Sequence, residues 1–153
     1  LEQHGYSRSA IGWLWALAVL AEVIAFTQMH RWLPRFGDQK IMLASLLLSA
    51  LRWAVIGIGI ESPLVVWAAQ LLHAASFATF HAAAISVIYR QFGEGHQGQG
   101  QALYSMLWGL GVALGSWWTG LVWDLHPLWS WLAAAIACLV AAAILFRRTD
   151  PLP

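Results

Sequence analysis

The sequence predicts an all-α membrane protein, a multi-pass bundle of five transmembrane helices. Hydrophobic residues make up 60% of its 153 residues, whereas charged residues make up only 10%. Water-soluble domains contain about a quarter charged residues, so too few polar side chains are present here to cover a surface in water. The apolar residues also form five long stretches, each near the roughly 20 residues that a helix needs to cross a hydrocarbon core.

The five expected helices are separated by segments whose composition is typical of loops. We place the helices near residues 11–29, 41–60, 64–89, 102–123 and 128–146. Ser62 and Pro63 stand at the start of the third helix, and Pro127 precedes the fifth. The glycine-rich segment QFGEGHQGQG follows the third helix. Helices are favoured over strands because backbone groups in lipid must be paired within their own segment.

The basic residues predict the orientation of the chain in the membrane. With five spans, one side of the membrane holds Arg31, Arg35, Lys40, Arg90, Arg147 and Arg148, and the other side holds only Arg8. Cytoplasmic loops carry an excess of lysine and arginine. We therefore expect a protein of the inner (cytoplasmic) membrane with its C-terminus in the cytoplasm and Leu1 outside.

Charge and cysteine content exclude several classes of function. The formal net charge is +1, so nucleic acid is not an expected partner. The expected partner is the lipid bilayer, which the apolar composition requires. The single cysteine, Cys138, excludes an intramolecular disulfide and a thiolate metal cluster. We expect neither a metal ion nor a cofactor.

Ionisable residues occur within the apolar stretches, where each costs about 2.5–3.5 kcal/mol on insertion scales. At about 1.5 Å per helical residue, Glu22 lies about 16 Å below the outer edge of its helix, Arg52 about 12 Å and His73 about 14 Å. These groups on three consecutive helices therefore share one level near the midplane. His81 lies about 12 Å further toward the cytoplasm, so the series forms a candidate ladder for protons.

The spacing of Gln70, His73, Phe77 and His81 places them on one stripe of the third helix. Such a stripe faces protein or a water-filled cavity rather than lipid. Other interpretations stay open: Glu22 and Arg52 form a structural ion pair, or His81 only hydrogen-bonds to a neighbouring helix. Metal binding is disfavoured because the histidines are eight residues apart and no carboxylate cluster joins them.

The fourth helix has a face of small residues that predicts close packing against another helix. Gly111 and Gly115 form a G-x-x-x-G pair, and Gly109 and Gly120 extend the face. In a transporter the same glycines permit rocking or bending. Tryptophans near the expected helix ends are interpreted as interfacial anchors: Trp13, Trp15, Trp32, Trp67, Trp123 and Trp129. Trp108 lies deeper in the membrane.

Four segments carry a resemblance to a known family: YSRSAIGWLWALAVLAEVIAFTQMHRWLPRFG, LLLSALRW, QLLHAASFATFHAAAISVI and YSMLWGLGVALGSWWTGLVWD. Together they resemble the major facilitator superfamily, and more narrowly its phenylpropionic acid transporter branch, a relative of lactose-permease-type proton symporters. The resemblance implies that this chain corresponds to helices 8 to 12 of a twelve-helix transporter, with the N-terminal half and helix 7 missing. The polar first residues, without an initiator methionine, fit a fragment that begins in a loop.

The resemblance also implies roles for particular residues. Arg35, Gly37 and Lys40 match the superfamily's conserved cytoplasmic loop, whereas Pro34 stands in place of its usual aspartate. Glu22, Arg52 and His73 or His81 are similar in kind to the residues of lactose-permease-like symporters that serve substrate binding and proton coupling. The acidic partner on helix 10 is absent here.

The expected function is secondary active transport of a small organic solute, coupled to protons, and the family implies an aromatic carboxylate. Glu22 would accept protons or pair with Arg52, which would neutralise Glu22 or an anionic substrate. His73 and Gln70 would contact the substrate or relay protons, with Phe77 and Trp108 as apolar walls. The alternative is a non-transporting helical subunit or a membrane enzyme, although Ser76, one turn from His73, lacks an evident third partner.

Overall fold

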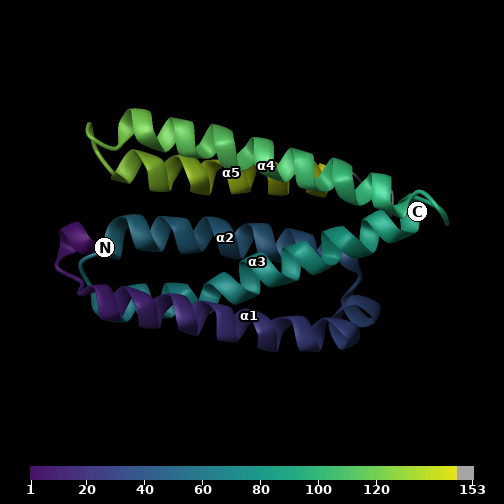
Figure 1. The fold of residues 1–153 in the computed structure, drawn as a ribbon, viewed down its shortest axis with the longest axis horizontal. Helices are drawn as coiled ribbons and strands as arrows, with labels where there is room; N and C mark the ends of the chain where they lie inside the picture. Colours follow the sequence, from purple (N-terminus) through teal and green to yellow (C-terminus); the bar gives the residue numbers. More distant parts are fainter. Residues whose placement is uncertain (148–153) are drawn as a thin grey trace.

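The computed structural model describes residues 1–147, and every regular element within them is a helix. A short 3-10 helix, η1 (Glu2–His4), precedes five α-helices: α1 (Arg8–Phe36), α2 (Asp38–Gly59), α3 (Pro63–Gln91), α4 (Gln97–Val122) and α5 (Leu128–Arg147). Successive helices run in opposite directions, so the ends of α1, α3 and α5 lie at one end of the bundle (Figure 1). Arg35, Arg90 and Arg147 in their last turns make this the basic end. Arg148 lies outside the described residues.

Four of the helices described in residues 1–147 are long and apolar enough to cross a membrane: α1, α2, α3 and α5. The helix α4 is not among them, although its 26 residues include no charged side chain. Its glycines, serines and tryptophans have low hydropathy, so the mean hydropathy of α4 is lower than its leucines and valines alone would give. The all-helical class is thus correct, and the fifth span stays a prediction.

The connection between α1 and α2 is much shorter than the sequence suggests. The expected loop around residues 30–40 is helical except at Gly37, because α1 continues through Pro34 to Phe36 and α2 begins at Asp38. Gly37 has φ +80°, a conformation that favours glycine, and its N–H donates to the Leu33 carbonyl at 2.9 Å. A single glycine therefore reverses the chain.

The core is built around α2 and α3. Figure 1 and the contacts between elements place α2 between α3 and α5, with α1 against α3. Alanines make the close contacts: Ala25 of α1 packs on Ala74 and Ala78 of α3, and Ala83 packs on Met29 and Ile41. Small residues let helix backbones approach closely, which drives association in lipid, where apolar burial gives little.

Polar contacts tie these helices together within the apolar core. Ser45 of α2 and Thr79 of α3 are joined by a buried hydroxyl–hydroxyl hydrogen bond of 2.6 Å. At the basic end, Arg90 of α3 forms an ion pair with the buried Asp38 of α2. The Gln39 amide donates to the Leu145 carbonyl of α5 at 3.3 Å. These bonds fix the register of α2 against both neighbours.

The helix α4 is the least enclosed of the five. Only Gly100 and Val122 of α4 are buried among the residues described. A methyl group added at the four glycines that the sequence assigns to helix packing would meet nothing within 4 Å: Gly109, Gly111, Gly115 and Gly120. Their packing role stays a prediction.

Large apolar side chains cover the outer surface of the bundle. Trp13 is 70% exposed, Leu20 59% and Ile24 56%, all on α1, and exposed leucines, valines and tryptophans continue along α4 and α5. Water-soluble monomers rarely expose contiguous apolar surface of this extent. The surface is that of a protein whose solvent is largely lipid.

We predict that Gly57→Leu destabilises the contact between α2 and α5. A Cβ at Gly57 would lie 2.9 Å from Trp131 Cβ and 3.0 Å from Leu128 Cδ1, so the larger side chain forces the helices apart. The expected loss of stability is about 1–3 kcal/mol, typical of overpacking. Thermal unfolding in detergent measures it, with Gly12→Leu as the control because nothing lies within 4 Å of Gly12. Equal melting temperatures of the two variants would contradict the close contact.

Candidate functional site

The centre of the candidate site is a contact between Glu22 of α1 and His73 of α3. Glu22 Oε1 lies 2.8 Å from His73 Nε2, and both side chains are mostly buried. The His73 Nδ1 atom is buried and has no hydrogen-bond partner among the residues that the structure describes. An unsatisfied buried polar atom costs about 1–3 kcal/mol, so this nitrogen is suited to a bound molecule or water.

His73 begins a column of aromatic rings along α3. The rings of His73 and Phe77 stack with centroids 5.2 Å apart, and those of Phe77 and His81 stack at 5.8 Å. This is the face that the spacing of three and four residues predicts. Trp108 of α4 meets Phe77 edge-on at 5.5 Å. The residues predicted on α3 are thus brought together with Trp108 of α4.

His81 has a partner that the sequence did not indicate. Its Nδ1 lies 2.8 Å from the hydroxyl oxygen of Tyr104 on α4. The expectation that His81 bonds to a neighbouring helix therefore describes its geometry correctly. It does not lie in the same contact as Glu22 and His73, because the Phe77 ring stands between the two imidazoles.

Arg52 of α2 is buried, with only 7% of its surface exposed. Its Nε donates to the Ala69 carbonyl at 3.1 Å, and its guanidinium carbon lies 4.3 Å from the centre of the Trp53 ring. The hydrogen-bonded partner of Glu22 in the structure is His73, so the suggested Glu22–Arg52 pair is not the contact observed. Arg52 still lines the same cavity as Glu22.

A cavity of about 610 Å³, here called the central cavity, joins these residues. Glu22, Arg52, Gln70, His73 and Phe77 all line it, so five of the predicted residues from three helices surround one space. Aromatic side chains complete its wall: Trp15, Trp53, Trp123 and Trp131. Small-molecule sites are mostly apolar clefts of about 300–1,000 Å³ with a few converging polar groups, and the central cavity has this character.

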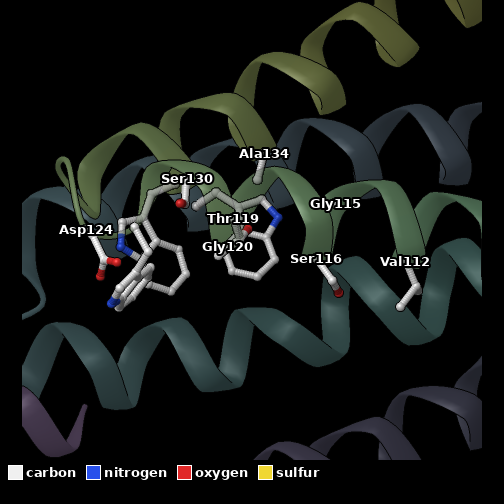
Figure 2. A pocket seen from close by; sticks show the side chains of 11 residues that line it. Val112, Gly115, Ser116, Thr119, Gly120, Asp124, Ser130 and Ala134 are labelled. Atoms are coloured by element: carbon white, nitrogen blue, oxygen red, sulfur yellow. The ribbon is translucent and has the colours of Figure 1, made fainter.

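A second cavity, of about 830 Å³, lies between α4 and α5 (Figure 2). Figure 2 shows Asp124 and Ser130 where α4 turns into α5, with Thr119 and then Ser116 further along α4. Trp53, Trp123 and Trp131 form a wall common to both cavities. Although this cavity is larger, it contains neither Glu22 nor His73, so the central cavity is the better candidate for the chemistry.

The predicted cytoplasmic-loop residues lie apart from the central cavity. Arg35 stacks over the Phe36 ring at 5.2 Å, Gly37 forms the turn, and Lys40 is exposed on α2. The charged contact at this end joins Asp38 and Arg90 instead. The sequence contains Asp38 at this point, but its partner Arg90 is 52 residues away, so the pair could be assigned only from the fold.

The hydroxyl of Ser76, one turn from His73, is occupied within its own helix. The Ser76 hydroxyl donates to the backbone carbonyls of Leu72 and His73 at 3.0 and 3.1 Å, which is a local helix contact. Within residues 1–147, no three His, Cys, Asp or Glu side chains are grouped as metal ligands.

The sequence model of the MFS_1 like family matches residues 1–133. This chain belongs to that family. Its membership agrees with the resemblance to major facilitator superfamily transporters and with the apolar helices of the bundle.

One curated relative is a "Probable 3-phenylpropionic acid transporter" of Escherichia coli (strain K12), which is 36% identical over 84 residues. The match covers 55% of this chain and 22% of the relative. The chain therefore matches less than a quarter of the length of that relative. No solved structure matches this chain.

We predict that the Glu22–His73 contact is energetically coupled. Replacing either residue by Leu leaves the other buried polar group unmatched, whereas replacing both removes the mismatch. A double-mutant cycle of Glu22→Leu and His73→Leu should give a coupling between about 0.6 kcal/mol, the average for polar contacts in a membrane bundle, and about 1.7 kcal/mol, the maximum.

Reversible unfolding in mixed micelles measures this cycle. The control pairs Glu61→Leu with His73→Leu, because Glu61 is exposed between α2 and α3. Those two costs should add. Additive costs for Glu22→Leu and His73→Leu as well would contradict a direct contact.

Proposed function

We propose that this chain forms part of a secondary active transporter that moves a small organic solute by alternating access, with protons as the coupling ion. One observation carries the proposal: a carboxylate and an imidazole meet at 2.8 Å on the wall of a cavity inside an apolar bundle. Polar groups at such a depth are expensive in lipid, and in membrane proteins they mark substrate and proton pathways.

The pair of Glu22 and His73 is suited to carrying one proton. A carboxylate and an imidazole nitrogen can each accept a proton, and at 2.8 Å a single proton bridges Glu22 Oε1 and His73 Nε2. When the proton leaves, the pair keeps the negative charge of Glu22, and nearby Arg52 offsets it in the same cavity. One cavity wall thereby holds both a proton site and a fixed positive charge.

The proposed substrate is a small aromatic carboxylate, such as 3-phenylpropionate. Arg52 supplies a guanidinium, whose planar donors match a carboxylate. Trp15, Trp53 and Phe77 supply aromatic walls for a phenyl ring, and Gln70 adds a neutral amide. The name of the Escherichia coli relative supports the same substrate class.

Transport requires more than the helices described here. Alternating access needs two halves that move against each other around a site near the midplane. We therefore propose that the functional unit includes an N-terminal half of the same protein, and that these helices alone do not transport. The basic end of the bundle is assigned to the cytoplasm, which places the C-terminus there, in the inner membrane.

We predict that cells expressing the full-length protein accumulate radiolabelled 3-phenylpropionate, and that a protonophore abolishes the accumulation. Glu22→Gln keeps the size of the side chain but removes its charge, so it should reduce accumulation about tenfold or more, as expected for the loss of a coupling free energy of about 1–3 kcal/mol. The matched control is Glu61→Gln, the same change at an exposed position.

The outcomes separate coupling from binding. Full accumulation by Glu22→Gln would remove Glu22 from the proton pathway. Accumulation by the parent that resists the protonophore would contradict proton coupling while leaving transport. A well-expressed parent that takes up no 3-phenylpropionate would contradict the proposed substrate.

A further inference from the structure

Three cavities follow α3 from the level of Glu22 toward the basic end. The central cavity meets a smaller one of about 240 Å³, here called the middle cavity, and both are lined by His73 and Phe77. The middle cavity shares Phe80 and Trp108 with a third cavity of about 440 Å³, here called the basic-end cavity. Shared aromatic side chains thus stand between neighbouring cavities along α3.

His81 and Tyr104 are separated from Glu22 and His73 by the ring of Phe77. Tyr104 lines the basic-end cavity and holds His81 Nδ1 at 2.8 Å. Trp108 meets the His81 ring edge-on at 6.0 Å, and Phe77 stacks on its face. Two turns of α3, about 12 Å, separate His81 from His73 along the helix. The imidazoles therefore have no direct hydrogen bond to each other.

We propose that His81 and Tyr104 form a second proton-transfer station, which passes protons between the bundle and the basic-end cavity. This inference rests on the proposed function, in which Glu22 and His73 bind the coupling proton. It assigns the hydroxyl of Tyr104, a residue without a role in that proposal, as the group through which the proton leaves. The proton crosses from the first station to the second through water when the Phe77 and Trp108 rings move apart.

The proton balance of the release step is simple. In the neutral state, Tyr104 O–H donates to His81 Nδ1, and the ring hydrogen is on Nε2. A proton that arrives binds at Nδ1, and the hydrogen bond reverses, since a hydroxyl both donates and accepts. For release, Tyr104 Oη accepts the Nδ1 proton while its own hydroxyl proton passes to water in the basic-end cavity. Both side chains end neutral, and one proton enters the cavity.

The contacts that the described part of the chain makes with this part of α3 come from uncharged groups. Ala25 and Met29 of α1 pack on Ala78 and Ala83, and Ser45 of α2 bonds to Thr79. The aromatic rings of Tyr104 and Trp108 come from α4. Tyr104 supplies the hydrogen-bond partner of the His81 ring, which makes Tyr104→Phe an informative change.

The test uses the purified full-length protein in proteoliposomes and compares two modes of transport. Exchange of labelled for unlabelled 3-phenylpropionate needs no net release of protons, whereas uphill accumulation driven by a pH gradient does. Tyr104→Phe keeps the ring stack and removes the hydroxyl. It should retain exchange within about twofold of the parent and lose accumulation by about tenfold, a difference of about 1.4 kcal/mol in coupling. The control is Tyr89→Phe, the same change at an exposed tyrosine of α3.

Each outcome decides the inference. Parental accumulation by Tyr104→Phe would overturn it, and so would equal loss of exchange and accumulation, which would make Tyr104 a structural residue. Failure of the parent itself to accumulate any aromatic carboxylate under a pH gradient would instead contradict the proposed function.

A second measurement is made on the parent protein, and a variant serves only to assign the signal. Nitrogen NMR of the ¹⁵N-histidine-labelled parent reports which ring nitrogen carries the hydrogen, with His81→Gln used to assign the signal. The inference expects neutral His81 with its hydrogen on Nε2 and Nδ1 accepting. A neutral ring with its hydrogen on Nδ1 would overturn the release step.

Discussion

The contact between Glu22 and His73 is the constraint on which the rest of the site depends. A carboxylate at this depth needs a partner, and the nearest solution in the fold is an imidazole on α3 at 2.8 Å. Holding that contact fixes the rotation of α3 about its axis, which then directs Phe77 and His81 along the same face. The alanines of α1 and α3 allow the approach because they keep the two backbones close. Packing with small side chains and polar pairing are therefore parts of one arrangement.

The site is built from helices that differ in how firmly they are held. The buried Ser45–Thr79 hydrogen bond and the ion pair of buried Asp38 with half-exposed Arg90 join α2 to α3. By contrast, α4 reaches α3 through aromatic contacts and the Tyr104–His81 bond, and most of its surface is exposed. Local stability follows the density of buried contacts, so α4 is the helix of this bundle most easily displaced. It also carries Trp108, one of the two aromatic residues that line both the middle and the basic-end cavities; the other, Phe80, belongs to α3.

Much of the fold followed from composition and from the lengths of the apolar stretches, because the requirement for paired backbone groups in lipid leaves little alternative to helices. Side chains on one helix were also predictable: the spacing of His73, Phe77 and His81 places them on one face. Contacts between helices were harder to predict, because the rotation and tilt of each helix are set by packing that a single sequence does not specify. The sequence therefore suggests Arg52 as a partner of Glu22 and gives no indication that Tyr104 is a partner of His81. The expectation of a loop around Gly37 was wrong. The polar composition of this segment suggests a coil, but the segment is helical on both sides of Gly37, and its Asp38 is paired with Arg90 of α3.

The turn at Gly37 has a mechanical consequence. Because one residue connects α1 to α2, the two helices cannot move apart at this end without a change in the backbone of Gly37. A tilt of α1 must be absorbed by backbone rotation at Gly37 or be transmitted to α2. Since α1 carries Glu22 and α2 carries Arg52, a tilt that is transmitted through Gly37 displaces both charged residues of the central cavity together.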